Sequence, residues 1–100
     1  MQSEGQAYIG TVADEQHADY LSRMTPAQCR AARALIPWKQ TDLAAHSRVS
    51  VRAIRHFEAG ERQPIPATLA AIRAALEAAG VEFIAENGGG AGVRLRKGED

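Results

Sequence analysis

Residues 40–60, QTDLAAHSRVSVRAIRHFEAG, limit more than any other stretch how this chain can fold. A polar first turn precedes the apolar pair Leu43-Ala44, which indicates a short helix that begins at Thr41 or at the residue before it. The stretch 46–50 is too short to connect distant elements. Val49 is the lone apolar residue in that stretch, so we expect it to reach the core.

A second helix is predicted over 51–59. Ser50 suits its N-cap position, and Gly60 suits the left-handed residue that ends it. Ile54 and Phe57 are three residues apart and therefore share one face. Cationic side chains occupy the other faces: Arg52, Arg55 and His56. The pattern predicts a helix with a buried stripe and an outward row of hydrogen-bond donors, although a merely solvated helix face is the alternative interpretation of that row.

The segment 26–73 resembles the Cro/C1-type helix-turn-helix domain (XRE family) of phage and bacterial repressors. Matching residues follow the family's order and spacing: Gln40, Leu43, Ala44, Val49, Ser50, Ile54, Phe57, Glu58, Gly60 and Pro64. The resemblance implies a mainly α, lambda-repressor-like DNA-binding domain of four to five helices. The family often has glycine in the turn, where this chain has Arg48. A positive φ at Arg48 would cost about 1 kcal/mol or more.

In such domains the second helix of the pair lies in the DNA major groove, with its N-terminal residues toward the base edges. The resemblance implies base contacts by Val51, Arg52, Arg55 and His56, of which Arg55 stays open between base and backbone. Phosphate contacts are expected from Lys39, Gln40, Arg48, Ser50 and Arg62. Arg52 offers a bidentate pair to guanine O6 and N7, and Val51 offers an apolar surface to a thymine methyl. His56 is a donor to guanine or to a phosphate.

Thr25-Pro26 marks the start of a helix that runs to about Ile36, because Thr suits the N-cap and Pro the first helical position. Its inward stripe is predicted to be Cys29, Ala32, Leu35 and Ile36, with Arg30 and Arg33 facing outward. Trp38 is interpreted as a lid on the core, with a stacking or phosphate contact as the alternative. Glu58 is expected to pair with Arg55 or Arg62, or to hold the loop that follows.

Another helix is predicted from Ala67 or Thr68 to Ala79, ended by Gly80. Its apolar stripe is Leu69, Ile72, Ala75 and Leu76. Beyond it, residues 81–86 and 93–97 alternate as strands around a glycine-rich turn, which predicts a β-hairpin. A lone hairpin is marginal in water, so we expect it either to pack on the helices or to pair with a second chain. We therefore divide the chain into an arm (1–24), a helix-turn-helix domain (25–80) and a hairpin tail (81–100) that is a possible dimerisation element.

The net charge of zero hides an uneven distribution. Residues 25–73 hold eight Lys and Arg and only three acids, a net of +5, which favours contact with phosphates. Residues 1–24 hold four acids and one base, and within them 12–24 is a candidate helix after a loosely attached start. The single Cys29 excludes an internal disulfide and fits a reducing cytoplasm.

We expect no cofactor, no metal and no enzyme activity, because the three His residues lack metal-ligand spacing and no catalytic triad is evident. No apolar run is long enough for a membrane span. The resemblance to the Cro/C1-type family therefore implies a cytoplasmic, nucleoid-associated regulator from a bacterium or phage, and most simply a repressor. It would bind an inverted repeat in double-stranded DNA as a homodimer. The alternative is an antitoxin-like module that binds a partner protein through residues 1–24 and uses its helices for autoregulation.

Overall fold

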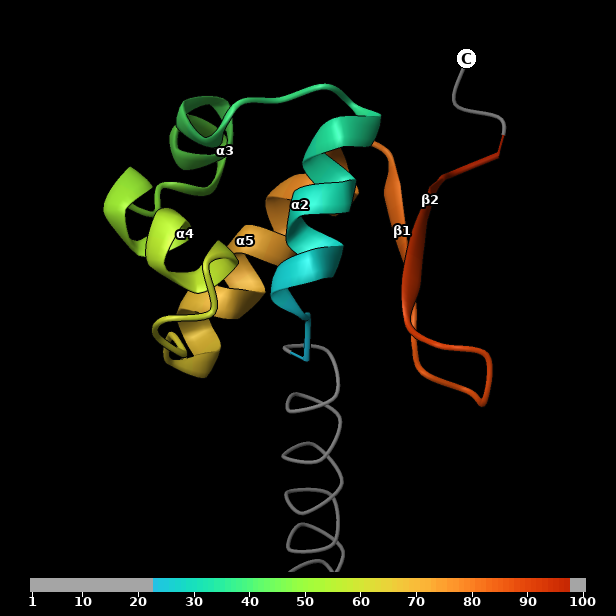
Figure 1. The fold of residues 1–100 in the computed structure, drawn as a ribbon. Coiled ribbons are helices and arrows are strands. Elements are labelled where there is room, and N and C mark those ends of the chain that lie inside the picture. The colour runs from blue at the N-terminus through green and yellow to red at the C-terminus, as the bar shows by residue number, and fades with distance from the viewer. Residues whose placement is uncertain (1–22, 98–100) are drawn as a thin grey trace, which may run out of the picture.

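The structure, a computed structural model, describes residues 23–97. Four helices in this range precede a two-stranded antiparallel sheet (Figure 1). The elements are α2 (Pro26–Leu35), α3 (Gln40–Ser47), α4 (Val51–Glu58), α5 (Pro66–Ala78), β1 (Val81–Ile84) and β2 (Gly92–Leu95). A mainly helical fold with a C-terminal hairpin is therefore confirmed. The predicted arm and helix over 1–24 lie outside the described residues, apart from residues 23 and 24.

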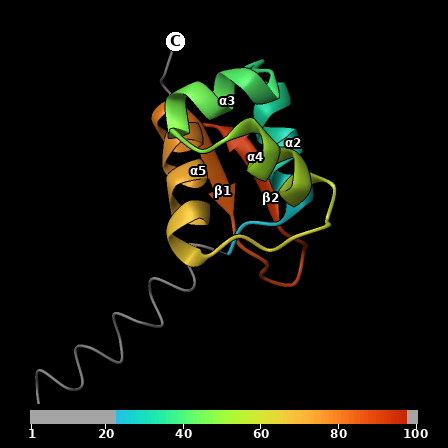
Figure 2. The same cartoon turned by 90° about the vertical axis from the view of Figure 1, so that its left-hand side faces the viewer.

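The hairpin and the α3–α4 pair lie on opposite sides of α2 (Figure 1). In the view turned by 90°, α3 and α4 face the reader and both strands lie behind them (Figure 2). This arrangement leaves the outer face of α4 clear of the hairpin. No helix among residues 23–97 has the length and apolar character needed to cross a membrane.

The sequence signals for the start of α2 and the end of α5 are confirmed. At α2, the Gln28 N–H donates to Thr25 Oγ1 at 3.0 Å, and the Thr25 N–H donates to Gln28 Oε1 at 3.0 Å. This reciprocal pair satisfies two backbone donors at the N-terminal end of α2. At the end of α5, Gly80 has φ 109°, a conformation that glycine adopts without a Cβ clash.

The core contains the predicted stripe of α5 and the predicted anchors of α4. The buried apolar residues are Met24, Cys29, Ala32, Leu43, Ile54, Phe57, Leu69, Ile72, Ala75, Leu76 and Val81. The assignment of Leu35 to the inward stripe is wrong, because its side chain is 37% exposed. Cys29, Ala32 and Ile36 follow the three- and four-residue spacing of one helix face, and Leu35 falls about 100° away from Ile36.

The hairpin packs on the helices of its own chain, which was one of the two predicted alternatives. Val81 pairs with Leu95 in the antiparallel register, and Val81 is fully buried. The side-chain amide of Gln28 donates to the carbonyl oxygens of Ile84 at 3.3 Å and Gly92 at 2.9 Å. The residue that completes the α2 cap therefore also ties both strands to that helix.

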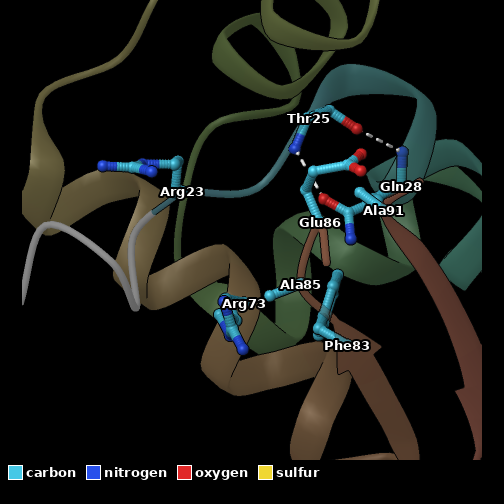
Figure 3. Close-up of a pocket in the computed structure, with 8 residues that line it drawn as sticks. All are labelled: Arg23, Thr25, Gln28, Arg73, Phe83, Ala85, Glu86 and Ala91. Carbon is cyan, nitrogen blue, oxygen red and sulfur yellow. Dashed lines mark hydrogen bonds between the residues drawn. The ribbon is translucent and has the colours of Figure 1, made fainter. Parts of the chain in front are cut away.

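Figure 3 shows the junction between the hairpin, α2 and α5 around a hollow of about 140 Å³. Arg73 and Phe83 both line this hollow, and the guanidinium carbon of Arg73 lies 4.8 Å from the ring centroid of Phe83 (Figure 3). The Glu86 carboxylate accepts the backbone N–H groups of Gly88 and Gly90, each at 3.0 Å. The glycine-rich turn is therefore shaped by a side chain of its own loop.

Candidate nucleic-acid interface

The connection between α3 and α4 is a tight turn with Arg48 in the left-handed region. Arg48 has φ 63° and ψ 25°, and its N–H donates to the carbonyl oxygen of Ala44 at 2.9 Å. It is the one non-glycine residue with a positive φ among those described. Val49 then packs against the core, as predicted. The turn thus keeps the geometry for which many proteins use glycine, and it places an exposed arginine there.

α4 is anchored by one apolar face and is capped at its start. Ser50 Oγ accepts the Ala53 N–H at 3.1 Å, which confirms the predicted N-cap. Ile54 and Phe57 are buried, with exposed fractions of 0% and 1%. Because these two side chains fix the rotation of α4 about its axis, Arg52 lies on the solvent face.

The Glu58 carboxylate, at the C-terminal end of α4, is the centre of a buried polar cluster. Arg33 binds it with two hydrogen bonds, Nε to Oε2 at 2.7 Å and Nη2 to Oε1 at 2.7 Å. The Gln40 amide donates to Oε1 at 2.9 Å, and the Cys29 thiol donates to Oε2 at 3.1 Å. Arg30 donates to the backbone carbonyl of Glu58. The cluster joins α2, α3 and α4 through one carboxylate.

Two predictions about this cluster are wrong. Glu58 does not pair with Arg55 or Arg62, and Arg33 does not face solvent, since its guanidinium fork closes on Glu58. Glu58 follows Phe57 directly in sequence, and its carboxylate contacts Cys29 and Arg33 of α2 rather than solvent. Arg33 is four residues after Cys29, so the i, i+4 spacing could have placed both on one face.

The surroundings of Glu58 shift the pKa values of three groups. Burial alone would raise the pKa of Glu58, but the hydrogen bonds from Arg33, Gln40 and Cys29 outweigh it and hold that pKa below its ordinary value. The hydrogen bond to Glu58 raises the pKa of Arg33. Burial, and then the adjoining carboxylate, raise the pKa of the Cys29 thiol strongly, so this cysteine is a buried donor rather than a nucleophile.

A pH dependence of stability follows from the lowered pKa of Glu58. A carboxyl whose pKa is lower in the folded state stabilises the fold above its unfolded-state pKa, and this contribution disappears as the pH falls through the folded-state pKa. We therefore expect the unfolding free energy of the wild type to drop more steeply than that of Glu58→Gln between about pH 5 and about pH 3. Urea unfolding across this range measures both slopes. Parallel curves for the two proteins would contradict the assignment.

Most residues predicted to contact DNA have side chains open to solvent. Exposed ones are Lys39, Arg48, Ser50, Arg52, Arg55 and Arg62, while Gln40, Val51 and His56 are half-buried. One N–H of the Gln40 amide is directed to Glu58, so a phosphate contact by this side chain depends on its other N–H. The structure brings Ser50, Arg52, His56 and Arg62 together around one hollow.

This hollow, which we call the α4 hollow, lies between α4 and the segment 62–68. Its volume is about 260 Å³. Its lining residues are Ser50, Arg52, Ala53, His56, Arg62, Pro64, Ile65 and Thr68. The sequence interpretation missed Ile65 and Thr68, because both were assigned only to the approach to α5. The only indication in the sequence was that Ile65, a large apolar residue, lies between Pro64 and Pro66.

Trp38 covers part of the core and stacks on an exposed side chain of α3. Its ring centroid lies 4.2 Å from that of His46, with an angle of 17° between the planes. Trp38 is half-buried against the core, which confirms the lid interpretation. The His46 ring is itself held by a 2.9 Å hydrogen bond from Nδ1 to the carbonyl of Asp42.

Replacing Arg48 by glycine is expected to lower DNA affinity without lowering stability. Glycine removes a left-handed strain of about 1 kcal/mol, and its extra chain entropy offsets part of that gain. We expect Arg48→Gly to unfold at equal or slightly higher urea concentration than the wild type. The predicted phosphate contact of Arg48 would be lost, so we expect this variant to bind all DNA sequences more weakly. Urea unfolding and duplex titration of the two proteins test this, and unchanged affinity would exclude Arg48 from the interface.

The chain matches no protein-family model and no curated protein. Within residues 23–97, no group of three or more His, Cys, Asp and Glu side chains is placed to hold a metal ion.

Proposed function

We propose that this protein is a sequence-specific DNA-binding regulator, and most simply a repressor, with a Cro/C1-type, lambda-repressor-like domain. Its α3 would cross the DNA backbone, and its α4 would enter the major groove. The observation that carries the proposal is the pairing of two short helices around the left-handed Arg48, with α4 fixed by Ile54 and Phe57 and exposing Arg52.

The electrostatics of this face support nucleic acid as the partner. Arg48, Arg52, Arg55 and Arg62 are exposed on or beside α4. Glu58, the one acidic residue of α4, is buried and paired with Arg33, whereas exposed Glu61 lies next to Arg62, outside α4. The outer face of α4 therefore keeps its positive charge, which attracts phosphates and orients the helix toward a groove.

The proposal includes a homodimer on an inverted repeat, because two half-sites about one helical turn apart match the two-fold symmetry of such dimers. The hairpin is the element we propose for the dimer interface. Leu95 on β2 remains 51% exposed, and the hairpin lies on the far side of α2 from α4 (Figure 1). Subunits joined through it would present both α4 helices outward. A cytoplasmic, nucleoid-associated location belongs to the same proposal.

Titration with duplex DNA tests the proposed function. The probes are the DNA upstream of the protein's own coding sequence and a scrambled duplex of equal composition. We expect tighter binding to the upstream duplex, and affinity for both that falls as salt rises from about 50 to about 200 mM. Arg73→Ala is a matched control, since this arginine lies on α5, outside both α4 and the hairpin, and pairs with Glu77. Absence of a salt-dependent complex with either duplex would refute the proposal.

A further inference from the structure

The α4 hollow joins positive charge to an apolar surface, and no carboxylate lines it. Two guanidinium groups, Arg52 and Arg62, and the imidazole of His56 line it together with the hydroxyls of Ser50 and Thr68. Such a lining fits an anion, because each of these groups can donate a hydrogen bond to an oxygen.

Ile65 supplies the apolar part of the lining. Its side chain is 67% exposed, against 51% for Leu95 and 37% for Leu35, the other large exposed hydrophobic residues in the described part of the chain. Pro64 lies next to it in the same lining. A ligand that matches the hollow therefore carries a hydrocarbon face directly beside its anion. A deoxyribose next to its phosphodiester has this chemistry.

The position of the hollow on the flank of α4 points to the same ligand. A helix with its side chains is about 10–12 Å across, and the major groove is about 12 Å wide. A helix in the groove therefore has base edges in front of it and a sugar–phosphate strand along each flank. The α4 hollow lies between α4 and the segment 62–68, so with α4 in a groove it would lie beside a strand, and Arg52 would border it on the side of the base edges.

We propose that the α4 hollow holds one sugar–phosphate unit of the DNA strand beside α4. Arg62 and Thr68 donate to the phosphate, and Ile65 packs on the deoxyribose. The inference rests on the proposed function and deepens it. It adds Thr68 and Ile65 to the interface, and of the two roles predicted for His56 it assigns the phosphate contact rather than the base contact.

The test replaces single phosphates of the preferred duplex, one at a time, by uncharged methylphosphonates. Affinities are measured for the wild type, Arg62→Ala, Ile65→Ala and the control Leu35→Ala, which lies on α2, outside both the α4 hollow and the hairpin. At one position per half-site, the methylphosphonate should weaken DNA binding by the wild type about tenfold. At the same position it should weaken DNA binding by Arg62→Ala less than about twofold. Ile65→Ala should bind every duplex about two- to threefold more weakly than the wild type. Leu35→Ala should match the wild type at every phosphate.

The possible failures are distinguishable. In one outcome the wild type binds duplexes, and each methylphosphonate weakens Arg62→Ala as much as it weakens the wild type. The sugar–phosphate site is then wrong and the proposed function stands. The site is also wrong if His56→Ala changes the base preference at one position. If the wild type binds no duplex at all, the proposed function and this inference are both wrong. Circular dichroism of each variant confirms that it is folded, as expected for substitutions at exposed or half-buried positions.

Discussion

Arg33→Ala is expected to lower the unfolding free energy by about 3–5 kcal/mol, because it leaves a buried carboxylate without its main partner. The Glu58 side chain is only 3% exposed, and Arg33 supplies two of the hydrogen bonds to it. Small domains have about 5–15 kcal/mol of stability, so this single change would leave the fold marginal. Urea unfolding at neutral pH, followed through Trp38 fluorescence, measures the loss.

Two further variants identify the cause of this loss. In Arg33→Met combined with Glu58→Gln, the buried charge is absent and the amide still accepts hydrogen bonds from Cys29 or Gln40. This double variant should regain at least half of the lost stability, because uncompensated charge, not lost packing, is the main cost. Arg55→Ala removes an exposed arginine and should change stability by less than about 0.5 kcal/mol. A cost below about 1 kcal/mol for Arg33→Ala would show that the cluster is not a structural centre.

Arg52→Ala is expected to bind the preferred duplex about 10- to 100-fold more weakly, since a bidentate guanine contact contributes about 1–3 kcal/mol of discrimination. Arg52 is exposed near the start of α4, on the face opposite Ile54. Removing the guanidinium should therefore leave the fold intact and make the protein indifferent to one base pair. Titrations with duplexes that carry each of the four base pairs at that position measure the effect.

The matched comparison for Arg52→Ala is Arg48→Ala. Arg48 lies in the turn before α4, so its loss should weaken binding to all sequences alike and lower the slope of log affinity against log salt by about one. Comparing the two variants therefore distinguishes the proposed base contact of Arg52 from the proposed phosphate contact of Arg48. If Arg52→Ala keeps the full preference at every position, the predicted register of α4 in the groove is wrong.

The helices were predictable because each has a local start or stop signal in the sequence. Thr25-Pro26 starts α2, Ser50 caps α4, and Gly80 ends α5, all as expected. The buried stripes of α4 and α5 followed from residue spacing alone. Such signals act within a few residues, so they do not depend on how the helices later pack.

The contacts of the Glu58 cluster were not predictable in this way. Arg33 and Glu58 are 25 residues apart in sequence, and nothing local to either residue indicates the other. A charged side chain is usually exposed, so the sequence interpretation placed Arg33 outside. The same limit applies to the α4 hollow. Its lining comes from α4 and from the segment 62–68, and only the tertiary fold brings Ile65 and His56 to one hollow.

Selection from random duplex DNA measures whether α4 contacts base edges from within a major groove. Protein-bound duplexes are recovered over several rounds and sequenced, with Arg52→Ala selected in parallel. We expect the wild type to enrich an inverted repeat with half-sites about 10 base pairs apart, and Arg52→Ala to lose one guanine from each half-site. A wild-type selection that enriches no sequence would contradict this expectation.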